Sequence, residues 1–375
     1  TLNHVLPLLA EAAPTHFLDA VENFLSTDSK LFLRIFEQEG CGPIFGQTYI
    51  SGLLWAIETL AWSPDYLTRA IVALGGLATI DPGGTWGNRP ANSIRTILLP
   101  WLPQTCADNE GRVAAVRALI REYPKVGWEA LLKLLPEGQS SSSHTRRPAW
   151  REYIPNTWTE RVTNKEYLDQ VEQYADIAVE ISKQNVGKVS DMIERFGNLT
   201  PTARETLLVF LVSNDFQAAD EDVRAKVWDA LSDLIVRHKK FADTDWALPE
   251  ELCLRLSRIL DLIAPSSAQR RYQRLFTEND FFLIEEIESY EPSLEKVELI
   301  RRDAVKEIFD KQGVDAVVEF SRSVRSSWGV GLSLGSLALD TDGRVLSSLL
   351  NAQEKTLRQF AGGYILGRFR SRGWA

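Results

Sequence analysis

Residues 50–80 carry the pattern that decides the fold, and they read ISGLLWAIETLAWSPDYLTRAIVALGGLATI. Apolar side chains recur every three to four residues on both sides of Pro64, which is the period of a helix. Proline cannot sit inside a helix without losing a hydrogen bond and clashing with the preceding turn. The segment therefore predicts a helix hairpin that turns at Pro64, with Tyr66 opening the second helix.

Two other segments repeat this pattern. Residues 3–25 are interrupted once, at Pro14, and residues 112–135 are interrupted once, at Pro124. Alternation with a period of two residues, the sign of strands, is nearly absent. The chain is thus predicted to be all-α, an α-solenoid or superhelix of stacked TPR- or HEAT-like hairpins.

The predicted organisation follows from where turn-forming residues gather. Hairpin repeats occupy residues 1–136, with an inserted Pro/Gly loop at 81–90; a Ser/Arg/Trp-rich connecting loop covers 137–160, a second helical array 161–312, and C-terminal helices 313–375. Thr163 and Glu166 form a capping box that starts a helix expected to reach Phe196. The first residue is not Met and the last helix reads as unfinished, so a fragment of a longer protein is expected.

Charge, hydropathy and cysteine content argue against several classes of function. The net charge of −9 argues against a general binder of nucleic acid or of anionic membranes. No signal peptide or apolar stretch of spanning length is visible, and Cys41, Cys106 and Cys253 are far apart, as expected of a cytoplasmic protein. Neither a metal site nor a cofactor is predicted.

Catalytic motifs are missing or incomplete. The segment around Gly187 and Lys188 fails the phosphate-loop spacing, and neither G-x-S-x-G nor H-E-x-x-H occurs. An α/α-toroid glycosidase is the alternative, because that class needs two carboxylates across a cleft. Its candidate pairs are Glu285 with Glu286, expected on a solvated helix face, and Asp243 with Asp245, expected to serve a turn.

Arginine and tryptophan mark the candidate partner-binding residues, since both dominate binding hot spots. They are Arg146, Arg147, Trp150 and Arg151 in the connecting loop, and Trp86 and Arg89 in the Pro/Gly loop. Pro148, Trp150 and Trp158 are expected to pin the connecting loop to the body and to leave its arginines displayed to an acidic partner surface. A plain connection is the alternative. Two further arginine clusters, at 270–274 and 368–372, are expected on solvated helix faces.

Five segments carry a family resemblance: residues 58–107, 127–136, 146–150, 237–252 and 360–374. Together they resemble the helical C-terminal region of large bacterial STAND-class NTPases of the antiviral Avs type. The resemblance implies a sensor that recognises a phage protein, with the rest of the same polypeptide supplying an NTPase and an effector and oligomerising when whole. This chain lacks the Walker motifs, so it is expected to be non-catalytic. The alternatives are the toroid enzyme and a structural protein-interaction scaffold.

Overall fold

The computed structural model describes residues 2–27, 33–39, 47–84, 86–137, 141–277, 294–337, 339, 341–349 and 352–373. The structure is 74 % helical. Strands in these ranges are limited to β1 (Gln38–Glu39) and β2 (Gln47–Thr48), which pair antiparallel with Gln38 opposite Thr48. The all-α prediction is confirmed.

The chain forms two compact units, and the first comprises residues 1–181 and 198–206. The boundary near residue 181 falls inside the range predicted as the second helical array. Apart from the two strands, the elements that begin in the first unit are α1 (Leu2–Ala12), α2 (Pro14–Thr27), η1 (Arg34–Phe36), α4 (Ile50–Ala61), α5 (Pro64–Ile80), α6 (Pro90–Leu98), α7 (Asn109–Glu122), α8 (Pro124–Leu134), α9 (Asn164–Gln184) and α11 (Pro201–Leu211).

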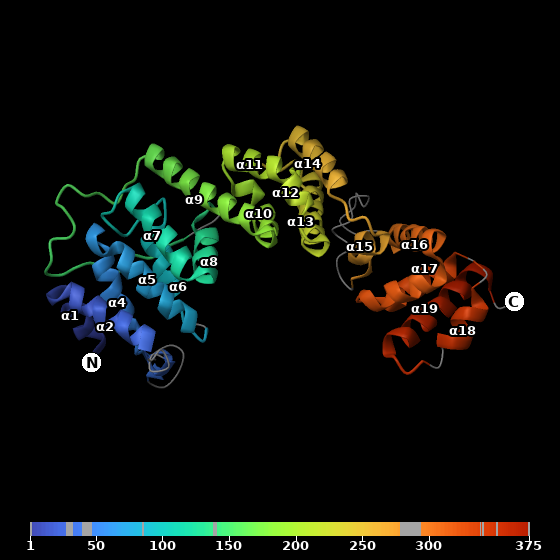
Figure 1. The fold of residues 1–375 in the computed structure, drawn as a ribbon, viewed down its shortest axis with the longest axis horizontal. Coiled ribbons are helices and arrows are strands. Elements are labelled where there is room, and N and C mark those ends of the chain that lie inside the picture. Colours follow the sequence, from blue (N-terminus) through green and yellow to red (C-terminus); the bar gives the residue numbers. More distant parts are fainter. Residues whose placement is uncertain are drawn as a thin grey trace. The chain divides into compact units, whose positions relative to one another are not determined.

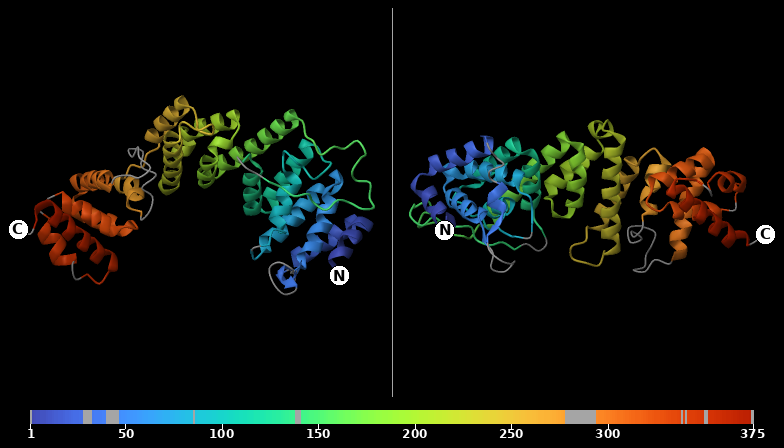
Figure 2. Two further views of the ribbon diagram at one scale, coloured as in Figure 1. Left: turned by 180° about the vertical axis from the view of Figure 1, so that it is seen from behind. Right: turned by 90° about the horizontal axis from the view of Figure 1, so that it is seen from below.

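Three helix hairpins stack in chain order in the first unit, as Figures 1 and 2 show in blue to green: α1 with α2, α4 with α5, and α7 with α8. Pro14, Pro64 and Pro124 each stand at the start of the second helix, where a missing amide costs nothing. Helix α4 packs on α1 and α5, and α5 packs on α7, so α4 is buried on almost every side. The predicted hairpins are confirmed.

The second unit comprises residues 182–197 and 207–375. Its elements are η2 (Val186–Lys188), α10 (Val189–Glu194), η3 (Phe196–Asn198), α12 (Asn214–Gln217), α13 (Glu221–Lys240), α14 (Glu250–Leu262), α15 (Ala268–Tyr272), η4 (Gln273–Phe276), α16 (Leu294–Ser323), α17 (Ser327–Ser336), α18 (Asp342–Leu349) and α19 (Lys355–Arg372). Within α16 the helix breaks at Gly313, whose φ of 79° favours glycine.

Local signals placed the start of α9 correctly and its end incorrectly. The amide of Thr163 donates to Glu166 Oε2 at 2.8 Å and the amide of Glu166 donates to Thr163 Oγ1 at 3.2 Å, which confirms the capping box. The helix was expected to continue to Phe196, but it ends at Gln184. Asn185 leaves the helical region there, and the short η2 and α10 follow.

Glycines on α17 bring the backbone of α19 unusually close. A Cβ added to Gly331 would lie 2.0 Å from the carbonyl oxygen of Phe360, and one added to Gly335 would lie 2.2 Å from that of Tyr364. Moving one turn from Gly331 to Gly335 along α17 moves the contact one turn from Phe360 to Tyr364 along α19. The two helices therefore run parallel (Figure 1).

Glycines on α19 make the reciprocal approach. A Cβ on Gly363 would lie 2.1 Å from the carbonyl oxygen of Trp328, and one on Gly367 would lie 2.3 Å from that of Leu332. Both helices thus carry glycines four residues apart, a spacing that lets two backbones meet directly. This parallel pair forms the centre of the C-terminal part of the unit, against the core residues Phe320, Phe360 and Tyr364.

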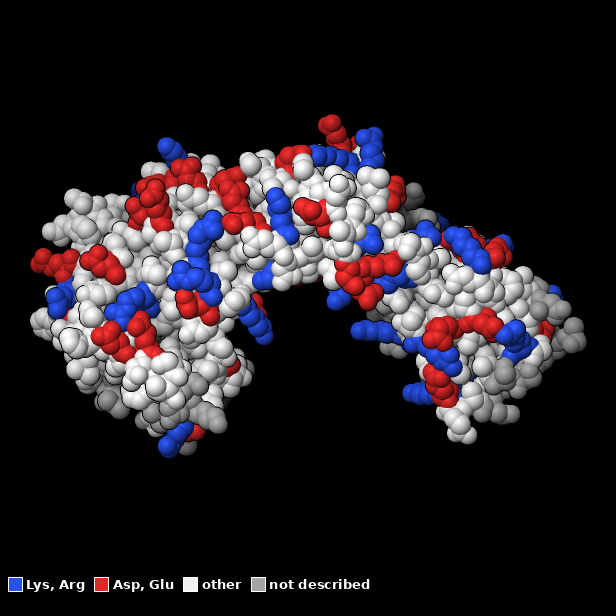
Figure 3. All heavy atoms as spheres, in the orientation of Figure 1, with Lys and Arg blue, Asp and Glu red and all other residues white. Residues whose placement is uncertain are grey.

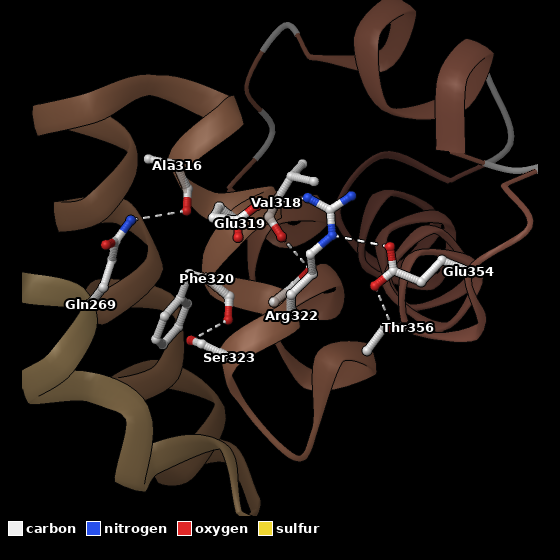
Figure 4. Close-up of polar contacts among 10 residues, drawn as sticks. Gln269, Ala316, Val318, Glu319, Phe320, Arg322, Ser323, Glu354 and Thr356 are labelled. Atoms are coloured by element: carbon white, nitrogen blue, oxygen red, sulfur yellow. Dashed lines mark hydrogen bonds and ion pairs between the residues drawn. The ribbon is translucent and has the colours of Figure 1, made fainter.

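Arginines of the second unit are mostly paired between helices. Arg270 and Arg274 pair with Asp229 and Asp233 of α13. In Figure 4, Arg322 lies between Glu319, 2.6 Å away, and Glu354, 3.1 Å away. Further pairs join Arg271 to Glu307, Arg368 to Asp342 and Arg370 to Glu298. Both predicted arginine clusters therefore link elements of the unit instead of forming purely solvated faces.

Candidate protein-binding site

The connecting loop between α8 and α9 is held by side chains of the helical body. Residues 141–163 contain no helix or strand and appear as the long green coil in Figure 1. Body side chains bond the main chain of residues 141–151, which we call the strap. Arg95 donates to the carbonyl of Ser141 at 3.2 Å, and Gln104 accepts from the amide of Thr145 at 3.4 Å. The contacts of Glu58, Trp62 and Glu11 are described below.

Glu11 makes the largest set of these contacts. Its side chain, on a residue only 3 % exposed, accepts from the amides of Ala149 at 2.9 Å, Trp150 at 2.6 Å and Arg151 at 2.9 Å. The Arg151 guanidinium in turn donates to the carbonyls of Glu11 and Ala12 at the end of α1. Charged hydrogen bonds of this kind are stronger than neutral ones, so the strap is fixed firmly to α1.

Glu58 holds the strap from α4. It is 6 % exposed and accepts from Ser93 Oγ at 2.6 Å and from the amide of Arg146 at 3.1 Å, while Trp62 Nε1 donates to the Arg146 carbonyl at 3.1 Å. Burial raises the pKa of Glu58, and the two hydrogen bonds oppose that rise. Arg146 is therefore anchored through its main chain.

The exposed side chain of Arg147 lies against two aromatic rings. Its guanidinium carbon lies 5.4 Å from the centre of the Trp62 ring and 5.5 Å from that of Trp158, within the range of a cation–π interaction. It also pairs with Glu160. Trp62 and Trp158 meet edge to face at 5.1 Å, so Trp158 does pin the loop as predicted.

The three arginines that were predicted to be displayed, Arg146, Arg147 and Arg151, are all exposed. Arg147 and Arg151 also bond within the chain, and Arg146 is exposed on an anchored backbone. Trp150 was expected to pin the loop, yet it is 79 % exposed, the highest value among the large apolar residues that the structure describes. Glu11 does the pinning instead, and it leaves Trp150 displayed.

Trp86 and Arg89 lie in the other loop, between α5 and α6. Arg89 pairs with Asp81 and donates to the carbonyl of Gly83 at 2.6 Å, so it closes its own loop, and Trp86 is half-buried. Gly83 and Gly84 have φ of 78° and 142°, as a Pro/Gly loop predicts. The two loops approach at a polar pocket of about 460 Å³ that is lined by Gly87, Asn92, Arg95, Thr96 and Ser141–Ser143.

The carboxylates considered for a toroid enzyme are differently placed. Asp243 and Asp245 are exposed in the turns after α13, where turn duty was expected, and Glu285 and Glu286 lie outside the described residues. The buried carboxylates of the first unit, Glu11 and Glu58, were not predicted as site residues. The sequence signal that could have found them is an acidic residue on the apolar face of an apolar helix. Their carboxylate oxygens accept hydrogen bonds from other residues of the chain.

No family model, curated protein or solved structure matches this chain. Within the described ranges, no helix is both long and apolar enough to cross a membrane. In the same ranges, no three His, Cys, Asp or Glu side chains are grouped so that they could hold a metal ion.

We expect Glu58→Gln to be tolerated. A glutamine at this position can accept from the Arg146 amide and donate to Ser93 Oγ, so both contacts survive without a buried charge. The raised pKa means that the folded state holds the Glu58 proton more tightly than the unfolded state. Its contribution to stability is therefore largest below the ordinary carboxyl pKa and declines as pH rises through the folded pKa.

Urea unfolding, measured from below the ordinary carboxyl pKa to above the pKa of Glu58 in the folded state, checks this expectation. The wild type should lose stability relative to Glu58→Gln as pH rises, and the variant should unfold within about 1 kcal/mol of the wild type at neutral pH. A loss of several kcal/mol in the variant would show that the charge itself holds the strap.

Proposed function

We propose that the chain is a non-catalytic helical scaffold that recognises a protein ligand. In its specific form, the proposal is that it serves as the ligand-sensing region of a bacterial antiphage NTPase, whose NTPase and effector belong to the rest of the same polypeptide. Recognition then depends on the shape and charge of a helical surface, and the ligand is a phage protein.

The observation that carries this proposal is the anchored display of Trp150. Tryptophan and arginine are both enriched in binding hot spots, and here an exposed tryptophan stands next to an exposed arginine, Arg151. Three hydrogen bonds from backbone amides to the Glu11 carboxylate hold the chain at Trp150. Little conformational freedom is therefore lost when a partner covers the Trp150 ring. The exposed Arg146 adds a positive charge on the same strap.

Surface charge and sequence resemblance support the same class of function. Figure 3 shows lysine and arginine interspersed with aspartate and glutamate over the displayed face, as on many protein-binding surfaces and unlike a nucleic-acid groove. The resemblance to Avs-type sensor regions is the reason for proposing a phage protein as the ligand. It extends through most of the chain, including the strap residues 146–150.

Replacing Trp150 by alanine in the intact protein should reduce phage protection without unfolding the sensor. A central hot-spot residue costs about 2 kcal/mol or more of binding free energy, which weakens ligand affinity about thirtyfold. Plaque counts on cells carrying each variant measure protection, and circular dichroism of the purified chain checks the fold.

The matched control is Leu262→Ala, which removes another largely exposed apolar side chain, 68 % exposed, from the end of α14. It should protect as the wild type does. If Trp150→Ala protects fully and remains folded, the exposed tryptophan is not a contact and the proposal loses its main support.

A further inference from the structure

The strap lies on the body as a peptide lies on a receptor. Side chains from α1, α4 and α6, together with Gln104, bond its main chain at both carbonyls and amides over residues 141–151. Contacts to the main chain are independent of sequence, so they would hold any extended segment that follows the same path. We call the surface formed by Glu11, Glu58, Trp62, Arg95 and Gln104 the strap groove.

One side chain of the strap is recognised specifically. Arg147 sits against Trp62 and Trp158 and pairs with Glu160, an arrangement that selects a planar cation. The buried Glu11 and Glu58 accept from main-chain amides of the strap, and the carboxylate beside Arg147 is that of Glu160. The groove is therefore complementary in charge and shape to an extended segment that carries an arginine.

The strap fits this groove imperfectly. Gln104 is completely buried, yet its Nε2 has no hydrogen-bond partner among the described residues, and its Oε1 reaches the Thr145 amide only at 3.4 Å. Thr145 Oγ1 is also buried without a partner there. An unpaired buried polar group destabilises the bound arrangement, so a segment that pairs with Gln104 Nε2 can bind better than the strap at this point.

We propose that the strap groove is a binding site for an extended, arginine-containing segment of a partner protein, and that residues 141–151 occupy it as an internal competitor. A bound competitor lowers the apparent affinity for an external segment by the fraction of time that the groove is open. Displacing the strap would also free Trp150 from Glu11, so binding in the groove and binding on Trp150 exclude each other. The inference goes beyond the proposed function; it shares the Glu11 contacts with it but also depends on Glu58, Trp62, Arg95 and Gln104.

A labelled peptide tests the groove directly. The probe is a fluorescein-tagged peptide with the sequence of residues 142–153, titrated with the purified chain and followed by fluorescence anisotropy. The strap is weakened by Arg147→Ala together with Arg151→Ala, which removes its cation–π contacts and its bonds to the end of α1 and leaves the groove side chains intact.

We expect the double variant to bind the peptide at least about tenfold more tightly than the wild type, because its own strap competes less. A peptide in which Arg147 is replaced by lysine should bind at least about tenfold more weakly, since the ammonium lacks the planar face. Adding Glu11→Gln to the double variant should weaken binding by a similar factor.

Three binding results would each overturn the inference. They are equal affinity of wild type and double variant, absence of binding to a double variant that keeps its helical circular dichroism, and indifference to the arginine-to-lysine change in the peptide. The last comparison alters only the peptide, so it does not depend on the folding of any variant. A dimeric double variant in light scattering would assign the groove to a second copy of the chain and would also contradict the inference. All these readouts are independent of phage protection, so this inference and the proposed function can fail separately.

Discussion

Gly363→Ala should disrupt the C-terminal helix pair of the second unit. The new Cβ would lie 2.1 Å from the carbonyl oxygen of Trp328, and no flexible side chain can yield because the obstacle is backbone. Helices α17 and α19 must then separate, and the buried core around Phe320 and Phe360 loses contact. Overpacking of this severity costs about 3 kcal/mol or more and lowers the melting temperature of a unit this size by roughly 6–12 °C.

The chain provides its own control one residue earlier. Gly362 is exposed on the same helix, and a Cβ there meets nothing within 4 Å. Gly362→Ala should therefore stabilise α19 by up to about 1 kcal/mol, because alanine is the better helix former. Hydrogen exchange of peptides from α17 and α19, read by mass spectrometry, separates the two effects. Equal exchange in both variants would show that the backbones do not meet as described.

Glu11→Gln should release the strap. Glutamine has nearly the same shape as glutamate, but one of its two oxygens becomes an NH₂ donor that faces backbone amides. At least one buried amide among residues 149–151 then loses its acceptor, and the remaining bonds lose their charge. The expected cost is about 2–3 kcal/mol, which speeds exchange of those amides roughly thirtyfold or more.

Two matched variants complete this experiment. Glu152→Gln changes an exposed carboxylate on the same loop and should leave exchange unchanged. Glu58→Gln removes the other buried carboxylate of the groove, yet it keeps both hydrogen bonds and should have a small effect. If Glu11→Gln and Glu58→Gln have the same effect on amide exchange, the three hydrogen bonds from backbone amides to Glu11 do not hold the strap in place.

The hairpins could be predicted because their signals are local. A proline between two apolar helical runs both ends one helix and starts the next, and the capping box at Thr163 contains both of its partners within four residues. The end of α9 was missed because nothing strong marks it. Asn185 and Gly187 are weak helix breakers, and packing decides whether such residues interrupt a helix.

The parallel pair of α17 and α19 and the strap groove could not be predicted, because each depends on contacts between distant residues. The four-residue glycine spacing at Gly331 and Gly363 was visible in the sequence, but it does not say which helices meet. Glu11 accepts from an amide 138 residues away, and helical periodicity alone names no partner for a buried acid. The same gap explains the error at Trp150, since Glu11 supplies the anchor that an aromatic side chain was expected to provide.

Site-specific photo-crosslinking at position 150 shows whether a phage protein contacts the exposed Trp150. A photoreactive phenylalanine analogue replaces Trp150 in the intact protein, and the same analogue replaces Leu262 as the control. Infected cells are irradiated, and the adducts are identified by mass spectrometry. We expect one phage protein to be crosslinked at position 150 and not at position 262, and expression of that protein alone should activate the defence. Infected cells with no adduct at position 150, or with the same adduct at both positions, would contradict this expectation.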